Sequence, residues 1–184
     1  MIELSLSAIN ACSPYKLRLS ALGGFDFDTD SGLTYNIALI QDYTFGESFQ
    51  TYMLNVLPHS MQEFYALREY RMSINVDKKI EPTVIAVLNE ALNNQNIVID
   101  YVCLSDDNRQ SSRFRLFNRW FQKNANDDIV LLSTSIEVDG IINYLGAFLR
   151  RDNPQFNEFC DAFSKFEEDI HKDCAANVNF RLTA

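Results

Sequence analysis

The sequence is poor in glycine, proline and histidine. Six Gly and four Pro are spread over 184 residues. No linker rich in Gly, Pro or Ser divides the chain, so we expect a single domain over residues 1–184. The two histidines, His59 and His171, lie far from any cysteine pair in the sequence, and this pattern argues against a zinc site. We therefore expect neither a metal nor another cofactor.

Cysteine is also scarce. The four residues Cys12, Cys103, Cys160 and Cys174 show no Cys-x-x-Cys spacing, and a chain of this length buries enough apolar surface to fold without disulfides. We expect four free thiols, which are typical of a reducing cytoplasm. Because the sequence has no run of about 18 apolar residues and no basic segment before an apolar stretch at the N-terminus, it predicts no membrane span and no standard secretion signal.

Positive charge is in short supply. The sequence has 16 Lys and Arg against 25 Asp and Glu, which gives a formal net charge of −9. Such a surface repels nucleic-acid phosphates on average, which argues against nucleic acid as a partner. The one local concentration of basic residues includes Arg115, Arg119 and Lys123 at four-residue spacing. This candidate basic face is small beside the roughly 6 to 10 phosphate contacts of strongly salt-dependent binders, so we interpret it as an ordinary solvated helix face.

Apolar and aromatic residues are abundant, at 47% and 12% of the chain, and predict a folded protein. Alternation and turn chemistry predict a hairpin of strands 25–28 and 33–41, and a second hairpin of strands 129–138 and 141–149 joined at Asp139-Gly140. Further strands are predicted at 15–19, 51–57 and 97–103. A helix is predicted at 61–70, although residues 72–76 alternate like a strand and leave its end undefined. A further helix is capped by Asp77 and ended by Asn93-Asn94, another spans 108–123, and the last is capped by Asn153 and runs to about residue 171. Short turns join most successive strands, so the predicted fold is α+β, a largely antiparallel sheet packed against three to four helices.

The last predicted helix has a narrow stripe of phenylalanine. Spacings of three and four residues put its apolar side chains on one face, namely Phe156, Phe159, Phe163, Phe166 and Ile170. We expect this stripe to pack on the protein's own sheet. The alternative is burial against a second subunit, with neighbouring acidic residues keeping the opposite face soluble.

The segment from strand 97–103 into the following helix holds the candidate polar site. Arg109 and Arg113 fall within the apolar arc of that helix, and a buried arginine needs a carboxylate or carbonyl partner. Asp100, Asp106 and Asp107 are near in sequence. One interpretation is structural, with ion pairs tying helix to strand, and Asp106 or Asp100 as partner of Arg113. The other is an anion site in which guanidinium groups bind a phosphate or carboxylate. A general base at Asp106 or Asp107 lacks a nearby histidine or glycine loop, so no catalytic residue is assigned.

The same segment resembles a family of uncharacterised bacterial proteins of unknown function. The resemblance depends on a Tyr-x-Cys strand, Tyr101 and Cys103, before an arginine-rich helix with the pattern Leu-Phe-x-x-Trp-Phe at residues 116–121. An early hairpin containing Phe27, Thr29, Gly32 and Tyr35 also fits, so the expected coverage is about residues 25–163. The resemblance implies a bacterial intracellular protein and identifies no catalytic residue.

These observations favour a small cytoplasmic protein that acts in interaction or regulation through protein–protein contacts, with a protein partner or a second copy of itself. The alternatives are an anion-binding or nucleic-acid-binding module that uses the 109–123 helix, and an enzyme of unrecognised type, which we favour less.

Overall fold

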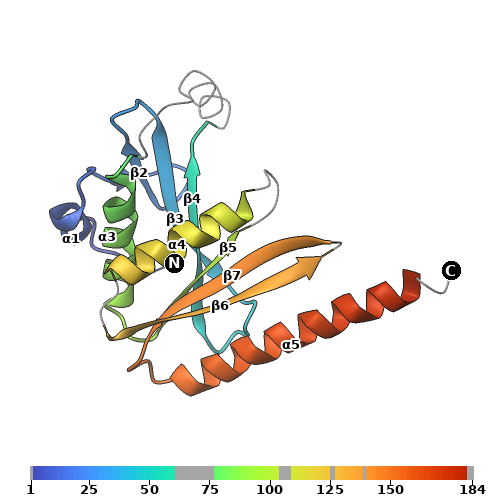
Figure 1. Cartoon of the computed structure of the whole chain (residues 1–184). Helices are drawn as coiled ribbons and strands as arrows, with labels where there is room; N and C mark the ends of the chain where they lie inside the picture. Colours follow the sequence, from blue (N-terminus) through green and yellow to red (C-terminus); the bar gives the residue numbers. More distant parts are fainter. Residues whose placement is uncertain (1, 61–76, 104–108, 125–126, 139, 182–184) are drawn as a thin grey trace. The chain divides into compact units, whose positions relative to one another are not determined.

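The protein folds around a seven-stranded sheet (Figure 1). The computed structural model describes residues 2–60, 77–103, 109–124, 127–138 and 140–181, without the side chains of residues 138 and 171–181. Within this part of the chain the strand order is β1-β2-β3-β4-β5-β7-β6. The sheet is mostly antiparallel, with β4 and β5 as a parallel pair, and four helices accompany it in the described residues. The predicted α+β class is confirmed.

The elements follow the predicted order closely. The strands are β1 (Arg18–Leu19), β2 (Phe25–Asp28), β3 (Thr34–Asp42), β4 (Gln50–Pro58), β5 (Ile97–Cys103), β6 (Ile129–Val138) and β7 (Ile141–Arg150). The helices are α1 (Leu6–Cys12), α3 (Ile80–Leu92), α4 (Gln110–Asn124) and α5 (Phe156–Arg181). Both predicted hairpins are confirmed. The strand predicted at 15–19 is only two residues long, α1 was not predicted, and the segments predicted at 61–70 and 72–76 lie outside the described residues.

The chain divides into two compact units. Unit 1 comprises residues 1–40 and 54–94, and unit 2 comprises residues 41–53 and 95–184. The single domain expected over residues 1–184 is not tested by this division and stays a prediction.

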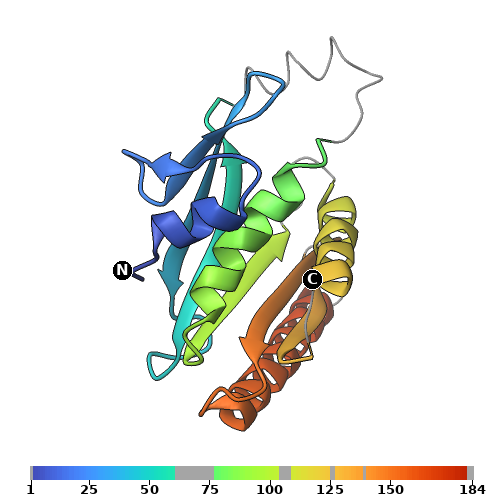
Figure 2. The same cartoon turned by 90° about the vertical axis from the view of Figure 1, so that its left-hand side faces the viewer.

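Unit 1 contains the first hairpin and two helices. Figure 2 shows α1 and α3 side by side on one face of these strands. Phe25 and Phe27 of β2 are buried, and the ring of Phe27 stacks on Tyr15 with 5.5 Å between centroids. Gly24, at the turn before β2, has φ of +69°, and a Cβ there would lie 2.2 Å from the carbonyl oxygen of Ile37. Only glycine fits this close approach between β2 and β3.

In unit 2, β5 is covered on both faces, as its continuous apolar sequence predicts. On one face, here called the α4 face, the ring of Tyr101 packs against Phe117 of α4 with 4.7 Å between centroids. On the other, here called the α5 face, Val98 packs against Phe159 and Phe163 of α5. Successive residues of a strand alternate between faces, so Asp100 shares the α5 face with Val98.

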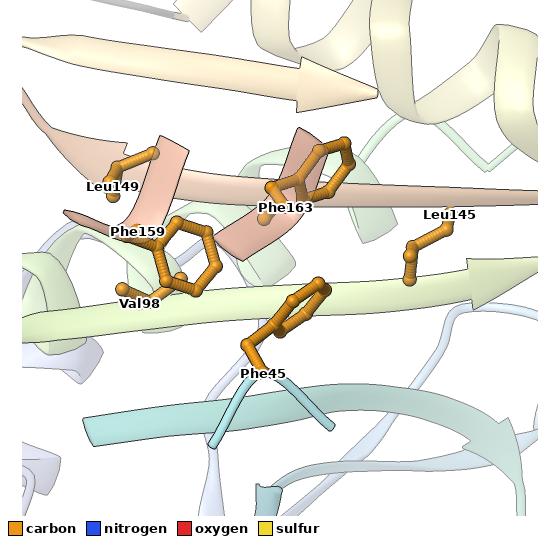
Figure 3. Packing of buried hydrophobic residues seen from close by; sticks show 7 residues of the cluster. Phe45, Val98, Leu145, Leu149, Phe159 and Phe163 are labelled. Carbon is orange, nitrogen blue, oxygen red and sulfur yellow. The ribbon is translucent and has the colours of Figure 1, made fainter. Parts of the chain in front are cut away.

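The phenylalanine stripe of α5 packs within unit 2. Figure 3 shows Phe159 and Phe163 over Val98 and Leu149 of the strands, next to Phe45 of the β3–β4 turn. The rings of Phe45 and Phe159 meet edge to face with 5.0 Å between centroids, and those of Phe45 and Phe163 stack at 5.5 Å. The prediction that the stripe packs on the protein's own sheet is confirmed.

Candidate functional site

The residues of the predicted polar site lie on different faces of the unit 2 strands. Asp100 is on the α5 face, whereas Arg113 belongs to α4, which packs on the opposite face. The charge of Arg113 acts on the thiol of Cys103, next to α4. A pair between Arg113 and Asp100, one of the two expected, stays a prediction, and the observed partner of the Asp100 carboxyl group is Asp42. Asp106 and Asp107 lie outside the described residues.

Arg109 is exposed and precedes α4, which begins at Gln110. Its carbonyl oxygen accepts a hydrogen bond from the backbone N–H of Arg113 at 2.9 Å, so Arg109 contributes its backbone to the first turn. The expected burial of its side chain is wrong, because the residue lies outside the helix on which the apolar arc was drawn. Arg113 is half-buried. The anion site at these arginines stays a prediction.

Burial raises the pKa of the Cys103 thiol to about 11, although the positive charge of Arg113 opposes the shift. The side chain of Cys103 is fully buried. A thiol in this state is a poor nucleophile, because the thiolate is the reactive form. Cys103 is therefore a core residue at the end of β5.

The candidate basic face has the predicted exposure. Arg115, Arg119 and Lys123 are all exposed on α4. The guanidinium group of Arg115 donates to the hydroxyl groups of Ser111 at 2.6 Å and Ser112 at 3.3 Å. These hydrogen bonds run along the helix surface, which agrees with the interpretation of a solvated face. Binding of nucleic-acid phosphates by this face stays the untested alternative.

Asp100 forms a carboxyl pair with Asp42, which the sequence did not predict. Asp100 is 1% exposed, and its carboxyl group hydrogen-bonds to that of Asp42 at the end of β3. Burial raises the pKa of Asp100 to about 8, and the hydrogen bond and negative charge of Asp42 add to the shift. Asp100 is therefore protonated near neutral pH and donates its proton to the Asp42 carboxylate.

Asp42 holds the negative charge of the pair. Its Oδ1 accepts hydrogen bonds from the backbone N–H of Tyr43 at 2.7 Å and of Thr44 at 3.2 Å, and from the Thr44 hydroxyl at 3.0 Å. Burial raises the pKa of Asp42, but hydrogen bonds from Asp100, Thr44 and Tyr43 outweigh it and leave the pKa below its ordinary value. The pair thus links the central strand β5 to the turn that carries Phe45 into the core.

Unit 1 contains a second polar network, also missed in the sequence. The carboxylate of Asp26, 7% exposed, accepts from Asn36 Nδ2 at 2.9 Å and lies 2.8 Å from Nε2 of His59. Next to it, Arg18 makes a two-point ion pair with Asp28, at 2.7 and 3.0 Å. Burial raises the pKa of Asp26, but hydrogen bonds from Asn36, Ser20 and His59 outweigh this effect and leave the pKa below its ordinary value. Since these groups satisfy one another across neighbouring strands, we interpret the network as structural.

The described residues contain no candidate metal cluster and no candidate membrane-spanning helix. Within them, no group of three or more His, Cys, Asp or Glu side chains is arranged to hold a metal ion. None of the helices in this part of the chain combines the length and the apolar character needed to cross a bilayer.

The strand β6 forms an edge of the sheet, and no strand pairs with its outer side in the described residues. All ten of its residues pair with β7 in an unbroken antiparallel register, from Ile129 with Arg150 to Val138 with Ile141. Its sequence, IVLLSTSIEV, contains one charged residue, Glu137, and no Lys, Arg or Pro. At the adjoining end of β7, Ile141 and Ile142 are 45% and 43% exposed.

Comparison with known proteins identifies one similarity. Residues 76–165 match DUF6169, a family of unknown function, which confirms the expected resemblance to such a family. The match contains β5, α4 and the β6–β7 hairpin, whereas the early hairpin at residues 25–42 lies outside it. No curated protein and no solved structure matches the chain.

Proposed function

We propose that this protein acts through protein–protein contacts, by pairing the exposed edge of β6 with an extended segment of its partner. An edge strand presents a row of backbone N–H and C=O groups that a further strand can satisfy. Because this recognition uses the backbone, it needs no cofactor and no catalytic group. The function is thus that of an interaction protein.

The observation that carries this proposal is that the described residues of β6 lack the sequence features that commonly protect an edge strand. Natural edge strands are commonly short, bulged, or marked with lysine or proline, which prevents pairing with other chains. β6 is ten residues long, has an unbroken register with β7 and contains one charge. Its exposed side chains include Ser133, Ser135 and Glu137, so part of the strand reaches solvent without being strongly apolar.

A cytoplasmic location belongs to the same proposal. Cys12, Cys103 and Cys160 are free thiols in the structure, and Cys12 is exposed. Free thiols persist in reducing compartments, which supports the cytoplasm as the place where the partner is met.

Site-specific cross-linking in the native host tests the proposed edge. A photo-cross-linking amino acid at position 135 on β6 is expected to give a covalent protein adduct, because that side chain lies at the contact. The same amino acid at position 112, also exposed but on α4, serves as the matched control and is expected to give none. The additional change Ser133→Lys places a charge on the edge and should abolish the adduct. Equal labelling at 135 and 112 contradicts the proposal.

A further inference from the structure

We propose that the partner of the β6 edge is a second copy of this chain, paired antiparallel about a two-fold axis at Thr134. This inference rests on the proposed function and names the occupant of the edge. The two β6 strands would become neighbours in one continuous sheet. Such an isologous contact uses the same surface of both copies and closes on itself.

The sequence of β6 is nearly symmetrical about Thr134. With Thr134 of one copy opposite Thr134 of the other, Ser133 faces Ser135, Leu132 faces Ile136, and Leu131 faces Glu137. The two serines are exposed, and Leu132 and Ile136 both pack against the α5-face core of their own unit 2. In three of these four positions, therefore, like residues meet like across the axis.

Other registers lose this match. A shift by one residue brings residues of opposite parity together, so that Leu132 faces Ser135, and an apolar side chain meets a polar one. Moving the axis to Ser133 keeps the parity but places Leu132 opposite Thr134 and Leu131 opposite Ser135. Of these registers, the axis at Thr134 is the one that places Leu132 opposite Ile136 and Ser133 opposite Ser135, so that like side chains meet in both pairs.

The two edges of the sheet differ, and this difference favours a closed pair. β1, at the opposite edge, is two residues long, against ten for β6. An open chain of copies needs two long edges that accept each other, whereas the meeting of two β6 strands leaves only the short β1 edges. A dimer is the expected product.

Disulfide trapping tests both the partner and the register. In the purified protein, Cys12, Cys160 and Cys174 are first changed to serine, and the buried Cys103 is kept. Thr134→Cys is then expected to give a covalent dimer on mild oxidation, because directly opposite residues of antiparallel strands have Cα atoms about 4.5 to 5.5 Å apart, within disulfide reach. The double variant Ser133→Cys with Ser135→Cys should do the same without disturbing the hydrogen bond from Thr134 to Glu167.

Glu137→Cys is the matched control on the same exposed strand. In the proposed register its two copies are separated by six residues, or about 20 Å, so it should stay monomeric. A dimer from Glu137→Cys but not from the central variants overturns the register. Failure of all three variants overturns self-pairing, and a photo-adduct at position 135 with a different protein then leaves the proposed function standing. If neither the disulfide-linked dimer nor the photo-adduct forms, self-pairing and the proposed function are both overturned.

Discussion

Phe159→Ala is expected to lower the free energy of unfolding by about 3–5 kcal/mol, the usual loss when a buried phenylalanine is truncated. The Phe159 ring is fully buried and meets the rings of Phe45 and Phe49 at 5.0 and 5.3 Å. Truncation removes the central ring of this cluster and leaves a cavity between α5 and the strands. Urea titration monitored by the fluorescence of Trp120, the one tryptophan, measures the loss.

Phe156→Ala is the matched control. Phe156 belongs to the same helix and the same stripe but is half-buried at the margin of the cluster. Because truncation of Phe156 exposes less apolar surface to water, the decrease in the free energy of unfolding should be clearly smaller than for Phe159→Ala. Equal losses for the two variants, or a loss below about 1 kcal/mol for Phe159→Ala, would contradict the packing of α5 on its own sheet.

Asp100→Asn is expected to remove a pH dependence of stability. The pKa of Asp100 rises from 3.8 to about 8 in the folded protein. Between these two values the folded state holds a proton that the unfolded state releases, so the free energy of unfolding falls as pH rises from about 4 to 8. Asparagine carries no such proton but can still donate a hydrogen bond to Asp42. The variant should therefore gain stability over wild type with rising pH, by up to about 5 kcal/mol at pH 9.

The measurement is a series of thermal or urea unfolding curves between pH 5 and 9, read as the difference between variant and wild type. Asp152→Asn, at an exposed ion pair with Arg150, is the control and should leave the shape of the pH profile in this window unchanged. Asp42→Asn should flatten the profile in part, since the negative charge of Asp42 contributes to the raised pKa of Asp100. A difference between Asp100→Asn and wild type that stays constant with pH would show that Asp100 is ionised in the folded state.

Local signals were sufficient to predict most of the fold. The 25–28 and 129–138 strands lie in hairpins, whose turns and alternation are encoded within a few residues. The α5 stripe was predicted because its period is that of a helix. By contrast, the insertion of β7 between β5 and β6 depends on which strand of the hairpin packs better against β5, and alternation within the hairpin does not distinguish the two.

The candidate site was predicted less well, because its partners are distant in the sequence. Asp100 was named as a candidate partner of the arginines, whereas its observed partner Asp42 ends β3. Only the parallel pairing of β4 with β5 and the β3–β4 turn bring Asp42 near Asp100. Arg109 falls inside the predicted helix 108–123, but α4 begins at Gln110, two residues after the predicted start, and Arg109 is exposed. Asp42 followed by Thr44 has the character of an Asx turn, which was the one local sign of its role.

Amide hydrogen exchange along β6, followed over a wide range of protein concentration, tests most directly whether this edge is the contact surface. If two copies pair through β6, protection of its amides should rise with concentration in wild type, because association is governed by mass action. The amides of β5 already lie inside the sheet, so their protection should not change with concentration. In Ser135→Lys, the protection of the β6 amides should stay at the level seen at low concentration. If the β6 amides of the wild-type protein exchange at the same rate at all concentrations, the pairing of β6 with a second copy is contradicted.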